Sequence, residues 1–275
     1  MKHRGIIFTD LDGTLLFETK DSLGIRKTSI RDEDLEALHM LRESGYLIVI
    51  ATGRDVKGIR RFLQQAYIAF DYYIGNNGAL ILNQFFQTLK CEAMDGSLLG
   101  EVITDVRANF PTANFSGTNE KNLYYFEQKQ RPEIIEEHEL VIPYTKYLAD
   151  PFKLTLLAIS EDDTLDKEVQ ITAAIAIAER ISNQFESRVN VFRNQTTVDL
   201  AAVGVSKGSA VEYIAKLEDI SLDAVYVIGD SWNDVSMFEI GATSYSFTHA
   251  EDQIQEKASH IVESFAEMVQ KLGIL

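Results

Sequence analysis

Two regions of the chain, one at each end, show an alternation of short apolar runs with longer amphipathic stretches. In the N-terminal region, apolar runs at residues 5–9, 46–51 and 71–75 are separated by segments at about 31–44 and 56–67 whose apolar positions recur with helical spacing. The runs predict strands and the spaced segments predict helices. Strands that alternate with helices predict a parallel sheet with crossover helices.

The C-terminal region repeats this pattern. Helices are predicted at residues 207–217, 234–240, 250–257 and at the C-terminal end, and strands at 224–229, 244–247 and 260–262. Because both regions show the same alternation of predicted strands and helices, we interpret residues 1–81 and 202–275 as two halves of one α/β sheet domain.

Residues 82–201 lack this regular alternation of short apolar runs and amphipathic stretches. The segments LYYFEQ, KLTLLAI and RVNVFRNQTTVDLAAV are strand candidates, and one long helix is predicted over about residues 166–185. This mixture predicts a separate α+β unit inserted into the sheet domain.

Composition narrows the classes of partner. With 26 basic and 42 acidic residues the formal net charge is −16, which argues against general affinity for nucleic acid or anionic membranes. An anionic substrate therefore needs a local positive site. Cys91 is the only cysteine, which excludes an intramolecular disulfide and favours a reducing, cytoplasmic setting. The first apolar run stops at Asp10, too early for a signal peptide, no stretch is long enough to span a membrane, and no protein partner is indicated.

Three of the predicted strands run directly into polar residues. The residues that follow these strand ends are Asp10 and Asp12, then Thr52, Gly53 and Arg54, and finally Asp230, Asn233 and Asp234. In an open parallel sheet the ligand crevice lies beyond the carboxyl ends of the strands. We therefore expect the three clusters to converge on one site.

The acids of these clusters predict a metal site. Asp10, Asp12, Asp230 and Asp234 would place up to four negative charges in a small space, a costly arrangement unless a hard cation lies among them. Oxygen ligands without cysteine or histidine favour Mg²⁺. The five histidines show no paired spacing for a transition metal and are expected in surface or core positions.

The remaining residues of the clusters suit phosphoryl transfer. Lys207, Thr52 and the backbone N–H groups of the Gly13 turn can bind phosphate oxygens. One carboxylate can attack phosphorus and form an aspartyl phosphate, and an acid two positions on can exchange protons with the leaving group and water. Mg²⁺ and Lys207 would stabilise the transferring group.

Each motif also has a structural interpretation. The segment DLDGT is compatible with a turn, Thr52 with a helix N-cap, and Lys207 with a solvated first-turn lysine. Asp230 and Asp234 are compatible with a helix cap and a first-turn acid. Arg54 is interpreted as a surface or pairing residue rather than a catalytic one.

Taken together, the motifs resemble a known superfamily. DLDGT at 10–14, the strand-terminal Thr52, Lys207 and GDSWND at 229–234 are similar to the four ordered motifs of the haloacid dehalogenase (HAD) superfamily. The finer pattern of ATGR, GNNGALI and GVSKGSAV around the inserted segment resembles the Cof-like sugar-phosphatase branch, subclass IIB. This resemblance covers essentially the whole chain and implies a Rossmann-like HAD core with an inserted α+β cap of type C2.

The resemblance also implies roles for individual residues. Asp10 would be the nucleophile and a Mg²⁺ ligand, and Asp12 the general acid/base, with its backbone carbonyl on the metal. Asp230 would be a direct metal ligand, and Asn233 and Asp234 would complete the metal and phosphate shell. The residues implied to bind substrate or phosphate are Gly13, Thr52, Gly53, Asn77, Lys207 and Asn233. Trp232 departs from the pattern of the branch, which more often has a small or charged residue there.

The sequence thus predicts a Mg²⁺-dependent phosphatase for small phosphorylated metabolites such as sugar phosphates. Within the superfamily, the acid at Asp12 favours a phosphatase over relatives of ion-pumping ATPases, which carry threonine there, and over dehalogenases, which lack the acid. A phosphomutase with the same phosphoenzyme and a non-catalytic sensor of phosphometabolites remain alternatives. The candidate specificity residues of the cap are Lys121, Tyr124, Lys129, Arg131 and Lys153.

Overall fold

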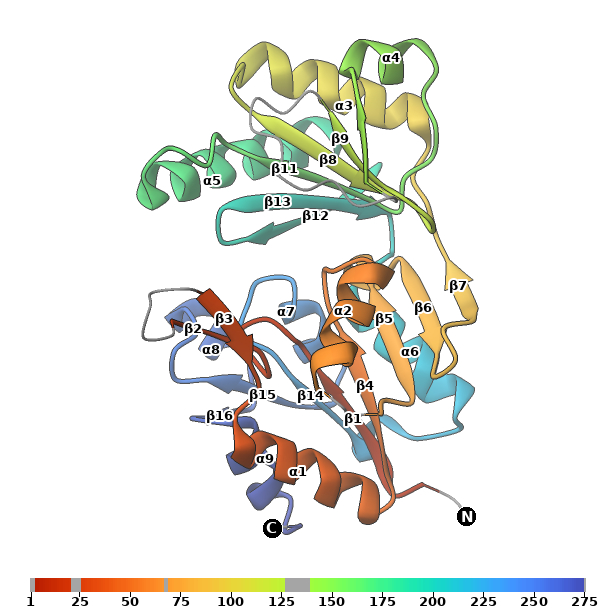
Figure 1. The fold of residues 1–275 in the computed structure, drawn as a ribbon, viewed down its shortest axis with the longest axis vertical. Coiled ribbons are helices and arrows are strands. Elements are labelled where there is room, and N and C mark those ends of the chain that lie inside the picture. The colour runs from red at the N-terminus through yellow and green to blue at the C-terminus, as the bar shows by residue number, and fades with distance from the viewer. Residues whose placement is uncertain (1–2, 21–25, 67–68, 127–138, 275) are drawn as a thin grey trace. The chain divides into compact units, whose positions relative to one another are not determined.

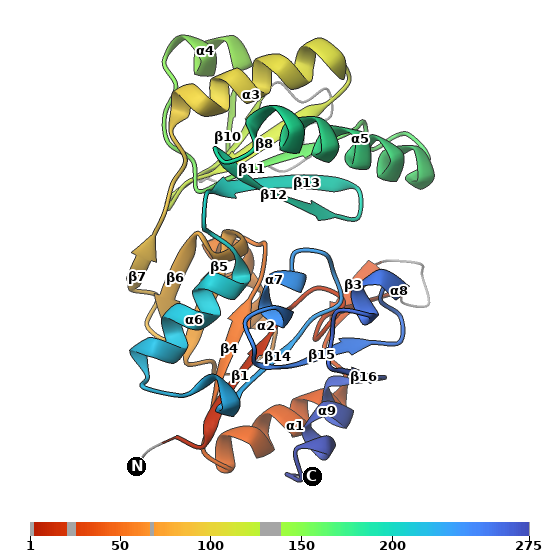
Figure 2. The ribbon, with the colours of Figure 1, turned by 180° about the vertical axis from the view of Figure 1, so that it is seen from behind.

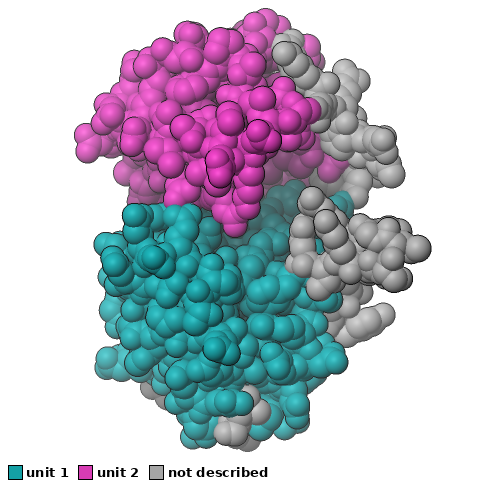
Figure 3. Space-filling view, turned by 90° about the vertical axis from the view of Figure 1, so that its left-hand side faces the viewer, with its two compact units in different colours: residues 1–89, 207–275 teal, residues 90–206 magenta. Residues whose placement is uncertain are grey.

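The structure is a computed structural model that describes residues 3–20, 26–66, 69–126 and 139–274. It divides into two compact units, which are distinguished by colour in Figure 3. Unit 1 comprises Met1–Leu89 and Lys207–Leu275, and unit 2 comprises Lys90–Ser206.

Unit 1 is built on an eight-stranded sheet (Figure 1). Its strands, in spatial order, are β16 (His260–Val262), β15 (Thr243–Phe247), β14 (Val225–Ile228), β1 (Gly5–Thr9), β4 (Tyr46–Ala51), β5 (Tyr72–Gly75), β6 (Leu80–Asn83) and β7 (Thr88–Cys91). The pairs from β16 through to β5 are parallel, and β6 pairs with β5 antiparallel. The parallel arrangement predicted from alternating strands and helices is confirmed.

Helices cover both faces of this sheet because its central strands are apolar on both sides. In β1, Ile7 packs into one hydrophobic cluster, whereas Ile6 and Phe8 pack into the other. The first cluster is covered by α1 (Asp32–Glu43), α2 (Val56–Ala66) and α9 (Phe265–Lys271), and the second by α6 (Lys207–Leu217), α7 (Val235–Phe238) and α8 (Asp252–Gln255). Figures 1 and 2 show the two faces in turn.

Unit 2 is an α+β unit with a six-stranded sheet. Its strands, in spatial order, are β10 (Glu139–Ile142), β9 (Leu123–Phe126), β8 (Asn114–Thr118), β11 (Leu156–Ser160), β13 (Thr197–Ala202) and β12 (Val189–Asn194). The helices are α3 (Gly96–Asn109), α4 (Tyr144–Ala149) and α5 (Lys167–Phe185). Phe115, Leu157 and Leu200 of the sheet pack against Leu99 of α3 and Ile177 of α5 in one cluster.

The elements and boundaries differ from the predicted ones in detail. The hairpin of β2 (Phe17–Lys20) and β3 (Arg26–Ser29) forms a two-stranded sheet of its own and was not predicted. The predicted change of unit after residue 81 falls inside β6, and the compact units divide eight residues later, after Leu89. On the C-terminal side unit 2 extends to Ser206 instead of residue 201.

Two of the candidate specificity residues, Lys129 and Arg131, lie outside the described residues. Among the described helices, none combines the length and the apolar character that a membrane span requires.

Candidate functional site

The site lies at the carboxyl ends of β1, β4 and β14 in unit 1. Because β1 pairs in parallel with both β4 and β14, the loops that follow these strands are neighbours. The N–H of Asp10 continues the sheet by donating to the carbonyl of Ile228 at 2.9 Å, and the N–H of Thr52 donates to that of Ile74 at 2.9 Å. The predicted convergence of three strand ends is therefore present in the fold.

Lys207 is the centre of the site. Its side chain is 0% exposed, and its Nζ donates hydrogen bonds of 2.6 Å to Asp10 Oδ1 and of 2.6 Å to Asp234 Oδ1. The alternative of a solvated first-turn lysine is thus incorrect for this residue. A charged ammonium is tolerated without water only where carboxylates compensate it, as they do here.

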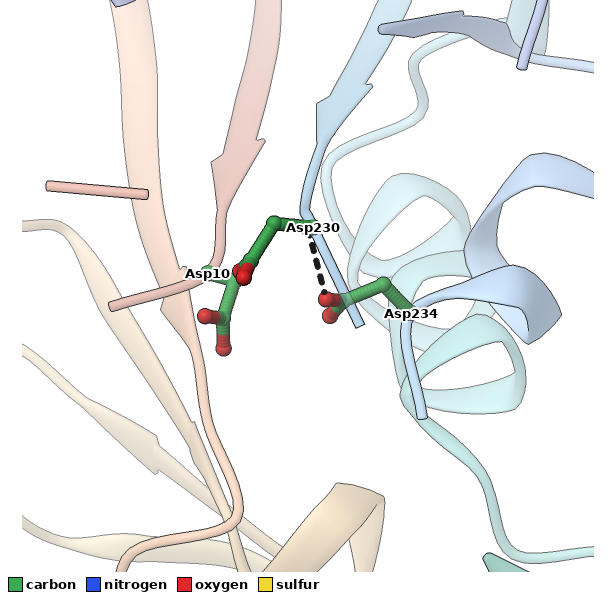
Figure 4. A group of neighbouring side chains, drawn as sticks. All are labelled: Asp10, Asp230 and Asp234. Atoms are coloured by element: carbon green, nitrogen blue, oxygen red, sulfur yellow. Dashed lines mark hydrogen bonds between the residues drawn. The ribbon is translucent and has the colours of Figure 1, made fainter. Parts of the chain in front are cut away.

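Asp230 completes a group of three carboxylates with Asp10 and Asp234, which Figure 4 shows converging. Each of the three offers a ligand oxygen, and these oxygens lie within 4.8 Å of one another. Asp230 Oδ1 accepts a hydrogen bond of 3.2 Å from Thr14 Oγ1. Asp234 Oδ2 accepts from the N–H groups of Asp230 and Ser231, at 3.1 and 3.0 Å, so it organises the loop that carries Asp230. At the N-cap position of α7, Asp234 makes no side-chain cap hydrogen bond.

Gly13 allows the close approach of two loops at this point. Its φ of +84° is favoured by glycine, and a Cβ there would lie 2.4 Å from Asp230 Oδ2. Any side chain at position 13 would therefore displace Asp230 from the group of acids.

The electrostatics of the three acids favour a bound cation. Burial, reinforced by the Asp234 carboxylate, raises the pKa of Asp230 to about 7. Burial also raises the pKa of Asp10 well above its usual value, against the opposing effect of Lys207. When all three are ionised, Asp10, Asp230 and Asp234 bring three negative charges against the one positive charge of Lys207, which leaves two to be compensated. An all-oxygen donor set with that charge fits a divalent hard cation such as Mg²⁺.

The raised pKa of Asp230 predicts how the metal-free protein responds to pH. An unfolded aspartate titrates near 3.8, so between about pH 4 and 7 the folded state binds the extra proton. The free energy of unfolding in EDTA should therefore fall as the pH rises through this window, by a few kcal/mol. Urea unfolding at pH 5 and pH 7.5 measures the change. Asp230→Asn should show a smaller fall, and an equal fall in both proteins would contradict the assignment.

A second set of polar residues lies beside the acids. The N–H of Asn77 donates to the carbonyl of Thr52 at 3.2 Å, and Asn77 Oδ1 accepts from Asn233 Nδ2 at 3.0 Å. Asn77 has a φ of +53°, in the left-handed region that asparagine tolerates. A Cβ at Gly53 would lie 3.1 Å from Asn77 Oδ1, so the Gly53 backbone approaches this side chain closely. The structure thus brings Thr52, Gly53, Asn77 and Asn233 together.

Asp12 is the exception to the convergence of carboxylates. Its side chain is 52% exposed and pairs with Arg54, whose Nε and Nη2 donate to its two oxygens at 2.7 and 2.6 Å. The carboxylate of Asp12 is not part of the three-acid group, so only its backbone carbonyl is left for the predicted metal contact. The interpretation of Arg54 as a pairing residue is confirmed, and its partner is a predicted site residue.

His249 also contacts the site, although its sequence position gave no indication of this. It hydrogen-bonds to the carbonyl of Gly13 through Nε2 at 3.0 Å, and its ring stacks on Phe247 with centroids 4.9 Å apart. Trp232, which departs from the family pattern, donates from Nε1 to Glu251 Oε2 at 2.9 Å. Neither contact has a local sequence signal, because each joins loops that meet only in the folded chain.

Comparison with known proteins identifies the family. A model of the haloacid dehalogenase-like hydrolases matches residues 7–268. The chain is 23% identical over 259 residues to a Bacillus subtilis protein named 5-amino-6-(5-phospho-D-ribitylamino)uracil phosphatase YcsE, covering 94% of this chain and 90% of that one.

Solved structures share the fold. The HAD subclass IIB sugar phosphatase BT4131 is 17% identical and superposes with a TM-score of 0.78, covering 98% of this chain and 100% of that one. TM0651 from Thermotoga maritima is 18% identical, with a TM-score of 0.71 and coverage of 100% and 97%. These likenesses confirm the predicted fold class, a Rossmann-like core with an inserted α+β cap. The match of the family model over nearly the whole chain carries the further conclusion that this protein is an enzyme and belongs to the haloacid dehalogenase-like hydrolases.

Proposed function

We propose that the protein is a Mg²⁺-dependent phosphatase that hydrolyses small phosphomonoesters through an aspartyl-phosphate intermediate on Asp10. The observation that carries the proposal is the buried Lys207, which joins Asp10 to Asp234 inside a group of three carboxylates. A strand-end carboxylate beside a buried cation and a divalent-metal donor set is suited to nucleophilic attack on a phosphate dianion.

The first half of the reaction transfers the phosphoryl group to the enzyme. Lys207 holds Asp10 Oδ1, which leaves Oδ2 to form a bond to phosphorus while the bond from phosphorus to the ester oxygen breaks. Asp12 gives its proton to the leaving oxygen. Thr52, Asn77, Asn233 and the Gly13 turn orient the phosphoryl oxygens.

The second half releases phosphate. A water molecule attacks phosphorus, its proton passes to Asp12, and the bond from phosphorus to Asp10 breaks. Asp10, Asp230, Asp234, Asn233 and the backbone carbonyl of Asp12 would hold Mg²⁺. Bound there, the cation would neutralise the acids and stabilise the charge of the transferring phosphoryl group.

The relatives suggest the class of substrate. One bears the name of a phosphatase for a phosphorylated ribityl chain and another is described as a sugar phosphatase. We propose sugar and polyol monophosphates as substrates. We also propose that the inserted region, predicted as residues 82–201 and largely the same as unit 2, is a cap that contributes specificity. We place the reaction in the cytoplasm, because the single cysteine, Cys91, is an exposed free thiol and such thiols are typical of reducing compartments.

A panel of sugar, polyol and aryl phosphates, with release of inorganic phosphate as the readout, tests the activity. We expect release with Mg²⁺ and loss of activity in EDTA, restored by excess Mg²⁺. Trp232 is the only tryptophan of the chain and lies two residues from Asp230, so its fluorescence should report Mg²⁺ binding independently of turnover.

The alternatives predict other outcomes. A phosphomutase would interconvert phosphate isomers while free phosphate stayed constant, and a sensor would bind a phosphometabolite without turnover. Phosphate release that persists undiminished in EDTA would contradict the metal-dependent mechanism. A fluorescence change with Mg²⁺ that survives in Asp230→Asn would show that the metal binds elsewhere.

A further inference from the structure

Arg54 connects the loop after β4 to the acid that the mechanism uses for proton transfer. Its own backbone is fixed, since its N–H donates to Thr52 Oγ1 at 3.2 Å and its carbonyl accepts from the N–H of Asn76 at 3.0 Å. Its guanidinium then reaches Asp12, which is 42 positions away in the sequence. The anchored backbone and the two-point contact together fix where the Asp12 carboxylate lies.

In the pair of Arg54 and Asp12, both oxygens of the carboxylate accept hydrogen bonds. Nε and Nη2 of Arg54 are directed at different oxygens, at 2.7 and 2.6 Å, so the planar fork fixes the plane of the carboxylate. Each ionised carboxylate oxygen keeps a second lone pair, and the 52% exposure of the Asp12 side chain leaves room for water beside it. In this arrangement a water molecule can approach Asp12 while Arg54 holds the carboxylate in place.

We infer that Arg54 is a positioning residue for the hydrolytic half of the reaction, and this inference rests on the proposed function. In that half, water forms a bond to phosphorus, the bond to Asp10 breaks, and the proton of the water passes to the oriented Asp12. Inorganic phosphate leaves and Asp10 returns to its starting form. Arg54 acts through Asp12 and takes no part in bond making itself.

The first half makes a different demand on Asp12. There the carboxyl group donates a proton to the leaving group, and a leaving group that departs as a stable anion does not need that proton. Hydrolysis of the phosphoenzyme still requires the oriented Asp12 to accept a proton from water. With such a leaving group, loss of Arg54 should slow hydrolysis of the phosphoenzyme more than its formation.

Unit 2 offers a matched ion pair as a control. Arg180 Nε and Nη2 donate to Asp105 at 2.7 and 2.6 Å, the same distances as in the pair of Arg54 with Asp12. The side chains of the two arginines are also similarly exposed, at 34% and 32%. Pairs whose arginine is this exposed to solvent contribute little to stability, so neither arginine is expected to be essential for folding.

The test uses p-nitrophenyl phosphate with Mg²⁺, because p-nitrophenolate departs without needing a proton and formation of the phosphoenzyme is thereby separated from its hydrolysis. For Arg54→Ala we expect a rapid burst of about one p-nitrophenolate per protein, followed by a steady state about 10- to 100-fold slower than wild type. Acid-quenched protein should carry phosphate on Asp10. Arg54→Lys should recover part of the rate, as should guanidinium ion added to Arg54→Ala at concentrations far below those that unfold proteins.

The outcomes separate this inference from the proposed function. Arg180→Ala is expected to match wild type in both phases. If wild type with Mg²⁺ releases neither p-nitrophenolate nor phosphate from any member of the panel, the proposed function fails. If wild type is active and Arg54→Ala is unchanged, faster in the steady state, or slowed equally in both phases, the inference about Arg54 is wrong while the phosphatase assignment stands.

Discussion

Replacing Asp10 by asparagine is expected to lower phosphatase activity by about four orders of magnitude or more, the scale seen when a covalent nucleophile is removed. The amide is nearly the same size as the carboxylate, but it is not a nucleophile toward phosphorus. Phosphate release from the best substrate of the panel, with saturating Mg²⁺, measures the loss. The variant should also form no acid-stable phosphoprotein.

Folding of Asp10→Asn should be preserved, which distinguishes loss of chemistry from loss of structure. Lys207 keeps its hydrogen bond to Asp234 in the variant, so the buried ammonium remains paired. Asp105→Asn is the matched control, because it removes one carboxylate from a 2.6 Å ion pair in unit 2. It should leave phosphate release close to wild type. Activity of Asp10→Asn comparable to this control would refute a covalent role for Asp10.

The sequence is informative about the position of the site because the strands that carry it are continuous apolar runs. The runs at Gly5–Thr9, Tyr46–Ala51 and Val225–Ile228 are strands whose side chains are nearly all buried, and each is followed by polar residues of the predicted site. Parallel pairing then brings the strand ends together whatever the remainder of the fold. Topology alone therefore predicts which loops meet.

The contacts among the side chains could not be predicted in the same way. Whether Lys207 is solvated or buried depends on packing between residues 197 positions apart. The departure of Asp12 from the other acids depends on Arg54, which local sequence cannot connect to it. Pairings of this kind are decided by tertiary structure, on which periodicity carries no information.

Some of the unpredicted structure did have a sequence signal. In α3, the buried Leu99, Val102, Ile103 and Val106 recur with helical spacing, and Asp95 caps the helix by accepting from the N–H groups of Ser97 and Leu98. The β2–β3 hairpin is different, because its short polar segments FETK and RKTS lack an apolar alternation. Without that alternation, periodicity does not predict the hairpin.

The second large effect is expected for Lys207→Met, which keeps the length of the side chain but removes its charge. The variant leaves Asp10 and Asp234 buried without their shared donor, next to Asp230. Removing one partner of a buried ion pair costs about 3–5 kcal/mol, so the metal-free variant should unfold at a markedly lower urea concentration. Turnover should fall by about 100- to 1000-fold even with Mg²⁺, because in the proposed mechanism the positive charge that holds Asp10 beside the transferring phosphoryl group is lost.

Charge, rather than volume, should explain the loss of stability. Lys216→Met, at an exposed position of the same helix, is the control and should be close to wild type in both stability and turnover. Adding Asp234→Asn to Lys207→Met removes one of the uncompensated charges and should recover part of the stability but none of the turnover. Mg²⁺ should also stabilise Lys207→Met more than it stabilises wild type, since the cation then replaces the positive charge that Lys207 supplied to Asp10 and Asp234. A stability loss that neither Asp234→Asn nor Mg²⁺ reduces would show that Lys207 contributes packing rather than charge compensation.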